Sequence, residues 1–205
     1  MSNKIKTIIF DLGGVIINSF GKELIDYVSK ELIIEQSELR DLMDKYEPDL
    51  QIGKITHVEF WEDILKEKRL SASKEILSKL WLIPYRKYAH INQKMINLVN
   101  KLKNDDYIVG IISNAQEPHN SYNRERGLFK YFNICILSSE VGIRKPDMEI
   151  FKLYLEKAEC KPEEAIFIDD EEKLLINANK LGIHTIHFQN IEQLKKELIS
   201  LDILV

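Results

Sequence analysis

The pattern of apolar and polar positions divides the chain into one short strand, a long helical stretch, and an alternation of helices and strands. The first apolar run, Ile8 to Phe10, stops at Asp11, and Gly13 and Gly14 follow. A short β-rich run bounded by glycines is typical of a buried strand whose last residue emerges at the edge of a sheet. Asp11 is therefore either an ordinary turn residue or a carboxylate presented where parallel sheets bind ligands.

Residues 20–88 change to helical periodicity, with apolar positions three and four residues apart. The sequence Glu-Pro-Asp at residues 47–49 predicts a break, and Gly53 predicts a second one. No strand is expected in this stretch. Because it is too long for a simple crossover between strands, it predicts a helical subdomain inserted after the first strand.

Signals inside this stretch set further helix boundaries. Thr56, with Glu59 three residues later, predicts a capping box that opens a helix. Either Ser71 or Ser73 opens the next helix, and Pro84 is expected to end it.

From residue 91 onward, helical and strand-like patterns alternate, as in α/β proteins. Pro146 is expected in the first turn of one of these helices. Further strands are predicted at residues 107–112, 134–137, 165–168 and 184–188. We therefore predict an α/β fold with a Rossmann-like, three-layer parallel-sheet core. Residues 1–16 and 89–205 form this core, and residues 17–88 form an inserted helical cap domain.

The composition limits the function classes. Hydrophobic residues at 44% and charged residues at 30% are typical of a globular protein with a sizeable core. The net charge of −4 predicts no basic surface for nucleic acid or an anionic membrane. No apolar run approaches a membrane span, and the first residues lack a signal-peptide core, so we expect a cytoplasmic location. Cys135 and Cys160 are too few for a disulfide framework.

Polar groups follow four of the predicted strands. If the strands are parallel and adjacent, these groups meet at one edge of the sheet. Each group alone also fits an ordinary turn, and Lys145 alone fits a solvated loop lysine, but the combination favours a site. The groups are Asp11, then Ser113 and Asn114, then Ser138 and Ser139 with Lys145 beyond them, and finally Asp169 and Asp170.

The chemistry of this combination points to a metal and a phosphate. Three carboxylates close together repel one another unless one is protonated or a cation lies between them. Oxygen ligands without nearby histidine or cysteine favour Mg²⁺. Beside a cation, a lysine and a serine hydroxyl, Asp11 could attack phosphorus and form an aspartyl-phosphate. Mg²⁺ and Lys145 would offset the negative charge of the transferring group.

Four segments together resemble a known family. They are FDLGGVI (10–16), IISNA (111–115), GIRKPD (142–147) and FIDD (167–170). In this order they resemble the four motifs of the haloacid-dehalogenase-like hydrolases, and they span most of the chain. The helical insert directly after the first motif resembles the small cap of the phosphatase branch. Within that branch the chain is similar to sugar-phosphate phosphatases, such as the glucose-1-phosphate phosphatases, and to the phosphatase domain of soluble epoxide hydrolases.

The resemblance implies a role for each residue of the combination. Asp11 would be the nucleophile and a Mg²⁺ ligand, and Lys145 would orient the phosphoryl group with it. Ser113 and Asn114 would bind that phosphoryl group. Asp170 would coordinate Mg²⁺, and Asp169 would be a further ligand or support the ligands.

The sequence departs from the family pattern at two positions. Relatives usually carry a second aspartate two residues after the nucleophile, which protonates the leaving group, but here that residue is Gly13. Its carbonyl could still ligate Mg²⁺, whereas general acid–base help worth about 10²–10⁴ in rate would be missing. Leaving groups that need no proton should therefore be favoured. The second departure is Leu174. Many relatives carry an asparagine there that supports the metal site, and leucine lacks its polar group.

Other residues could compensate or line a substrate pocket. His57, near the Gly53 break, and His119, beyond Asn114, are candidate acids, although lone histidines in polar helices more often lie on the surface. Four aromatic residues could line the pocket, although aromatics at helical spacing are more often core residues. They are Trp61, Trp81, Tyr85 and Tyr88.

We thus predict a Mg²⁺-dependent phosphatase that acts on a small phosphorylated metabolite such as a sugar phosphate. A weak or inactive relative that only binds phosphate ligands is the alternative that Gly13 and Leu174 keep open. A 2-haloacid dehalogenase would use the same aspartate without a metal, so Asp169 and Asp170 argue against it. The expected partner is the metabolite, without nucleic acid or membrane, and the expected oligomeric state is a monomer or a homodimer.

Overall fold

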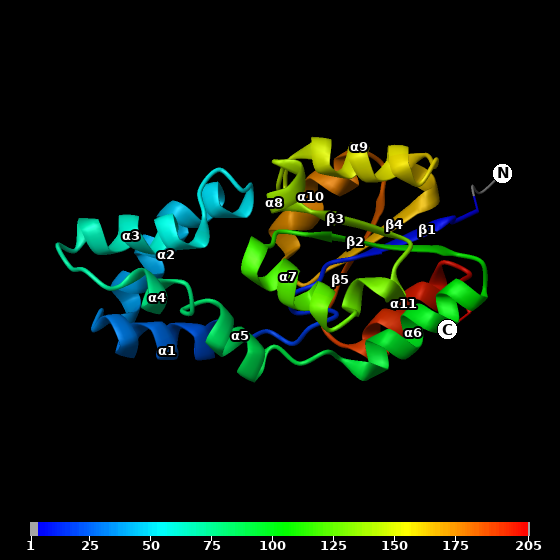
Figure 1. Ribbon diagram of the computed structural model, residues 1–205. Coiled ribbons are helices and arrows are strands. Elements are labelled where there is room, and N and C mark those ends of the chain that lie inside the picture. The colour runs from blue at the N-terminus through cyan, green and yellow to red at the C-terminus, as the bar shows by residue number, and fades with distance from the viewer. Residues whose placement is uncertain (1–3, 205) are drawn as a thin grey trace.

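The computed structural model describes residues 4–204, and its centre is a five-stranded sheet (Figure 1). The order of the strands is β3-β2-β1-β4-β5, and all neighbours are parallel. This confirms the predicted α/β fold with a parallel sheet. The strands are β1 (Thr7–Phe10), β2 (Ile108–Ser113), β3 (Ile134–Leu137), β4 (Ala165–Asp169) and β5 (His184–His187).

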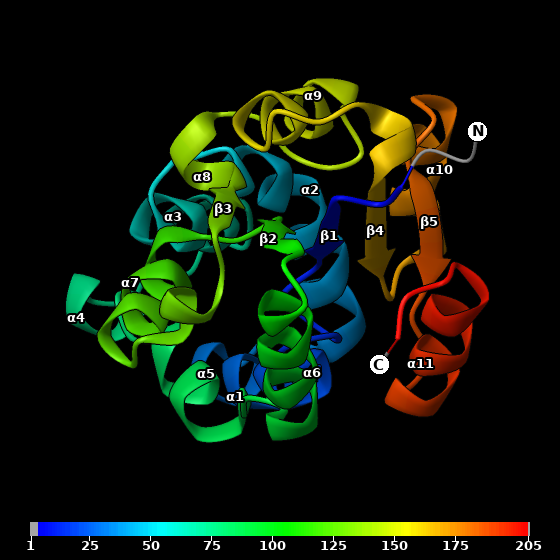
Figure 2. The same cartoon turned by 90° about the vertical axis from the view of Figure 1, so that its right-hand side faces the viewer.

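Each strand contributes side chains to two apolar layers, because successive side chains point to opposite faces of a sheet. In β1, Ile8 and Phe10 belong to one buried cluster, while Ile9 belongs to the other. Helices α6 (Gln93–Asn104) and α11 (Ile191–Ser200) cover the first face (Figure 2). The opposite face is covered by α9 (Met148–Lys157) and α10 (Glu172–Lys180). The result is the three-layer arrangement predicted from the sequence.

Shorter elements complete this part of the chain. They are α7 (Glu117–Glu125), the 3₁₀ turn η1 (Leu128–Tyr131), α8 (Ser138–Val141) and the 3₁₀ turn η2 (Pro162–Glu164). Helix α8 begins directly where β3 ends, and the sequence pattern did not predict it.

Five helices follow β1 and lie together to one side of the sheet (Figure 1). The apolar faces of the first four form a separate buried cluster around Phe60, Trp61 and Trp81, whereas Tyr85 of the fifth belongs to a core cluster. Thr56 and Glu59 form the predicted capping box at the start of α3. The helices are α1 (Gly21–Leu32), α2 (Gln36–Gln51), α3 (His57–Glu67), α4 (Lys74–Leu77) and α5 (Leu82–Tyr88). We call them the cap; its boundaries at residues 17 and 88 stay a prediction.

Three prolines do not act as the sequence pattern suggested. The expected break at residues 47–49 is wrong, because α2 continues through Pro48, and buried Leu50 anchors its last turn in the cap. Pro84 does not end a helix but is the third residue of α5, where the missing N–H has no helical partner to lose. Pro146 precedes α9, whose N-cap is Asp147.

The two segments that join cap and core run side by side. Asn18 holds them together: its Oδ1 accepts from the backbone N–H of His90 at 2.6 Å, and its Nδ2 donates to the Tyr88 carbonyl at 3.1 Å. The cap also touches the core beyond β3, where Ser138 Oγ donates to the Gln51 carbonyl at 2.5 Å. Between residues 4 and 204, no helix has both the length and the apolar character needed to cross a membrane.

Candidate active site

The register of the sheet brings the strand-end residues together. Phe10 pairs with Ile111 on one side and with Ile168 on the other. The next residues, Asp11 and Asp169, therefore stand side by side at the carboxyl edge of the sheet. Ser113 ends the neighbouring strand β2. The sequence could assign these residues to strand ends, but only the pairing shows that they are neighbours.

Lys145 lies at the centre of this edge. Its ammonium donates to Asp11 Oδ1 and to Asp169 Oδ2, both at 2.5 Å, and the side chain is 1% exposed. The possibility that it is a solvated loop lysine is therefore wrong, because the loop after α8 turns its side chain inward. The second oxygen of Asp169 accepts the backbone N–H of Glu171 at 2.9 Å.

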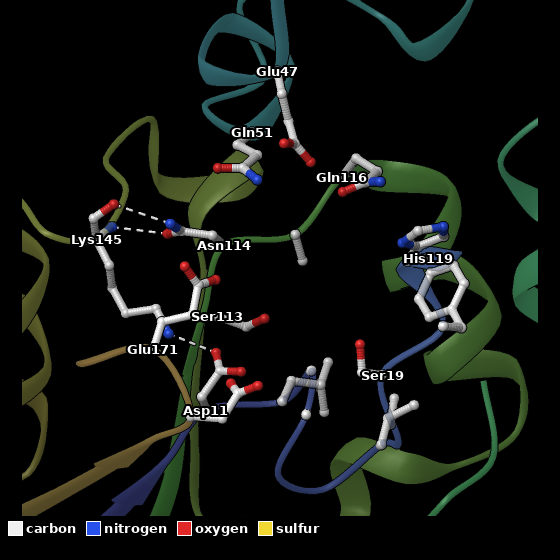
Figure 3. A pocket seen from close by; sticks show the side chains of 18 of the residues that line it. Asp11, Ser19, Glu47, Gln51, Ser113, Asn114, Gln116, His119, Lys145 and Glu171 are labelled. Atoms are coloured by element: carbon white, nitrogen blue, oxygen red, sulfur yellow. Dashed lines mark hydrogen bonds and ion pairs between the residues drawn. The ribbon is translucent and has the colours of Figure 1, made fainter. Parts of the chain in front are cut away.

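Asn114 holds Lys145 in place. Its Nδ2 donates to the Lys145 carbonyl at 2.9 Å, and its Oδ1 accepts the Lys145 N–H at 2.8 Å (Figure 3). The side chain thus fixes the backbone of the lysine, whereas the resemblance assigned Asn114 to the phosphoryl group. Ser113 is buried and lines the adjoining pocket.

Asp170 completes a cluster of three carboxylates. One oxygen from each of Asp11, Asp169 and Asp170 lies within 4.8 Å of the others. Gly14 makes this approach possible, because a Cβ atom there would stand 2.0 Å from an Asp170 oxygen. The backbone at Gly14 also has a φ of +73°, which favours glycine.

Charge in this cluster is unbalanced. Burial raises the pKa of Asp11 to about 7; Lys145 opposes this shift, while Asp169 and Asp170 add to it. Burial and the charge of Asp169 raise the pKa of Asp170 as well. For Lys145, burial lowers the pKa, but the charges of Asp11 and Asp169 outweigh burial and raise it.

The cluster fits a hard divalent cation. Three carboxylates face one ammonium group, and a bound cation would relieve the excess negative charge that raises the pKa values of Asp11 and Asp170. Oxygen donors alone suit Mg²⁺, which takes a few carboxylates and completes its shell with water or phosphate oxygens. The residues that could hold it are Asp11, Asp169, Asp170 and the carbonyl of Gly13.

Both positions that depart from the family pattern lie at this site. A Cβ atom at Gly13 would meet only Asp11 Oδ2, at an ordinary 3.8 Å, so the site has room for a side chain that the sequence does not supply. Leu174 is buried at the start of α10 and also lines the pocket, with an apolar side chain beside the carboxylates.

A cavity of about 360 Å³ opens above the cluster, between core and cap. Core residues form its floor, and α1, α2 and α5 of the cap contribute to its walls and roof (Figure 3). From the cap, Glu47 and Gln51 of α2 point into it. Sequence analysis missed both residues because it ended the helix at Glu47. Their spacing of four residues, which puts them on one helix face, was the available signal.

One wall of the cavity is aromatic. His119 stacks on Tyr85 with ring centroids 3.8 Å apart, and Phe20 and Trp81 meet the His119 ring edge-on. Burial lowers the pKa of His119 to about 3, so its ring is neutral near pH 7. The predicted aromatic candidates Trp81 and Tyr85 thus line the cavity.

The remaining candidates lie elsewhere. Trp61 is a core residue of the cap. His57, at the start of α3, and Tyr88, at the end of α5, are not among the residues that line the cavity.

Known proteins are similar to this chain in fold and in sequence. A solved structure of a haloacid dehalogenase family enzyme from Bacteroides thetaiotaomicron, in complex with magnesium and inorganic phosphate, has a TM-score of 0.76 to this chain. Its sequence is 27% identical, and the match covers 93% of this chain and 98% of that chain. D-ribitol-5-phosphate phosphatase from Bacteroides thetaiotaomicron is 25% identical in an alignment of 207 positions, which covers 95% of this chain and 97% of that protein.

Some relatives are longer proteins. Acyl-CoA dehydrogenase family member 10 from Mus musculus is 44% identical over 72 residues, which are 35% of this chain but 7% of that protein. The chain likewise covers 20% of bifunctional epoxide hydrolase 2 from Sus scrofa. The chain thus spans less than half the length of several relatives that it matches.

The sequence pattern of one family covers most of the chain. It matches residues 8–188, which include the cap, Asp11 and β4 with Asp169, and which end before α11. The chain belongs to the haloacid dehalogenase-like hydrolase family.

Proposed function

We propose that this protein is a Mg²⁺-dependent phosphatase that hydrolyses a small phosphorylated metabolite through an aspartyl-phosphate on Asp11. The observation that carries the proposal is the position of Asp11. One of its oxygens is held by buried Lys145 at 2.5 Å, two further carboxylates stand beside it, and a cavity of metabolite size opens above it.

The residues divide the reaction between them. Asp11 Oδ1 is held by Lys145, which leaves Oδ2 to attack phosphorus and expel the leaving oxygen from the opposite side. Lys145 and the Ser113 hydroxyl stabilise the charge that spreads over the phosphoryl oxygens. Water then attacks the phosphorus of the aspartyl-phosphate and releases phosphate and free Asp11. Asp11, Asp170, Asp169 and the Gly13 carbonyl would hold Mg²⁺, which would supply positive charge for the phosphoryl oxygens.

The cavity favours a hydroxylated substrate of modest size. Its wall combines polar groups, among them Gln51 and Gln116, with the aromatic surface of Trp81 and Tyr85. A volume of about 360 Å³ lies at the lower end for small-molecule sites. The similarity to a D-ribitol-5-phosphate phosphatase supports a sugar or polyol phosphate.

The test is hydrolysis of p-nitrophenyl phosphate with Mg²⁺ and with EDTA, followed by a panel of sugar and polyol phosphates. We expect Mg²⁺-dependent release of phosphate, and we expect Asp11→Asn to abolish it because the amide is not a nucleophile. Asp41→Asn, which removes an exposed carboxylate on α2, is the matched control. No turnover with any divalent metal, together with retained phosphate binding, would instead identify a phosphate-binding relative. Metal-independent release of halide from 2-haloacids would identify a dehalogenase.

A further inference from the structure

The site lacks an obvious proton donor for the leaving group. An alkoxide that leaves phosphorus needs a proton, and a positioned acid typically contributes about 10²–10⁴ in rate. At the position two residues after Asp11, Gly13 offers only its backbone. If the proposed phosphatase acts on alkyl phosphates, the acid must come from another wall of the cavity.

Most titratable groups of the cavity wall are unsuited to this task. The Tyr85 hydroxyl faces away, where it donates to Asn123 Oδ1 at 3.2 Å, and burial raises its pKa. His119 is neutral, with a pKa of about 3. Arg144 does not give up its proton in proteins. Glu171 is held in an ion pair with Lys173 at 2.8 Å, on the same rim as Asp170.

Glu47 remains, and its position suits a general acid. Its carboxyl points from α2 into the cavity, on the side opposite Asp11 (Figure 3). In a direct displacement, the attacking and leaving oxygens stand on opposite sides of phosphorus. A phosphoryl group seated on Asp11 would therefore direct its leaving oxygen toward the roof of the cavity. Among residues 4–204, no cation forms an ion pair with Glu47.

We propose that Glu47 of the cap is the general acid and base of this enzyme, in place of the aspartate that Gly13 replaces. The inference rests on the proposed phosphatase function. As Asp11 Oδ2 bonds to phosphorus and the bond to the leaving oxygen breaks, the Glu47 carboxyl gives its proton to that oxygen and the alcohol departs. Water then attacks the phosphorus; one of its protons passes to the Glu47 carboxylate, and hydrogen phosphate and ionised Asp11 are released.

The environment of Glu47 favours the protonated form that an acid needs. Burial raises its pKa, the negative charges of Asp44 and Glu171 act in the same direction, and a hydrogen bond from the Gln51 side chain and the charge of Arg144 oppose them. Lys173 stands on the same wall but is paired with Glu171. The side-chain oxygen of Gln51 is buried without a partner, so a second polar atom beside Glu47 is free to contact a leaving group.

The experiment compares two classes of leaving group in wild type and Glu47→Gln. p-Nitrophenolate leaves without protonation. The alkoxide leaving groups of alkyl phosphates need a proton; the alkyl phosphates of the panel are glycerol 3-phosphate and five- and six-carbon sugar and polyol phosphates. We expect Glu47→Gln to lower kcat/KM by about 10²–10⁴ for the best alkyl phosphate of this panel, while kcat/KM for p-nitrophenyl phosphate changes little. Asp41→Asn should change neither value.

Each other outcome overturns the inference. An equal loss for both substrate classes would mean that Glu47 shapes the cavity rather than donating a proton. A selective loss in Glu171→Gln but not in Glu47→Gln would place the acid on the core. Wild type that cleaves p-nitrophenyl phosphate but no alkyl phosphate would show that no acid acts at all. Wild type without activity on either class contradicts the proposed phosphatase itself, which separates the two failures.

The pH profile gives a second readout that a structural role would not move. An acid must be protonated, so kcat/KM for the alkyl phosphate falls as pH rises through the pKa of Glu47. Asp44→Asn removes a negative charge that raises this pKa, so the alkaline limb should move to lower pH. In Glu47→Gln the limb should disappear. A limb that stays in place in both variants contradicts the assignment.

Discussion

Replacement of Lys145 by methionine tests the electrostatic arrangement of the site. Methionine keeps an unbranched chain of similar length but removes the ammonium that bridges Asp11 and Asp169. Both carboxylates would remain buried, since Asp11 is 7% and Asp169 0% exposed. In the absence of metal, the variant should therefore be strongly destabilised. In the presence of Mg²⁺, it should have no phosphatase activity.

The magnitude follows from burial. Removing one partner of a buried ion pair typically costs about 3–5 kcal/mol, because the remaining charge is uncompensated. The folded-state pKa of Asp11, about 7, already lies above its value of about 4 in an unfolded chain. Its contribution to stability is therefore present at low pH and lost as pH rises through the folded pKa. Loss of Lys145 raises that pKa further, so the cost should be larger at pH 8 than at pH 5.

The assay is urea unfolding in EDTA at both pH values, with the free energy of unfolding compared between variant and wild type. Lys152→Met is the control, because Lys152 forms an exposed pair with Glu149 whose loss should cost at most about 1 kcal/mol. If Lys145→Met stays within about 1 kcal/mol of wild type at pH 8, or if its cost is larger at pH 5, the reasoning is refuted.

Two further substitutions test the acid and the cap. In the Glu47→Gln background, Gly13→Asp should restore cleavage of alkyl phosphates, because the backbone there accepts a Cβ atom and the new carboxyl stands where relatives carry their acid. The measurement is kcat/KM for an alkyl phosphate, and no recovery would contradict the role given to position 13. Gly53→Ala should lower the free energy of unfolding by about 1–2 kcal/mol, because Gly53 has a φ of +71°. It should also raise KM, because a Cβ atom would stand 2.5 Å from the Ser139 carbonyl, where the cap contacts the core. An unchanged KM for p-nitrophenyl phosphate would show that this contact does not hold the cap.

Two prolines show that the local sequence pattern does not always predict where a helix ends. Pro48 and Pro84 were expected to end helices, yet Pro48 lies inside α2 and Pro84 inside α5. In α2, the buried side chain of Leu50 holds the last turn against the cap and outweighs the lost N–H. The break expected at residues 47–49 also concealed the position of Glu47. Its side chain points into the cavity opposite Asp11 because α2 continues past it.

The sequence by itself determined the strands, the edge where they end, and the residue types gathered there. Asp11, Ser113 and Asp169 follow from where each apolar run stops, because burial ends at the edge of a sheet. Local pattern could not decide the partners of these residues. Strand pairing placed Asp169 beside Asp11, and a loop more than 130 residues from Asp11 buried Lys145 between them. Packing of the cap over the core brought Glu47 above them. These contacts join distant parts of the chain, so only the tertiary structure decides them.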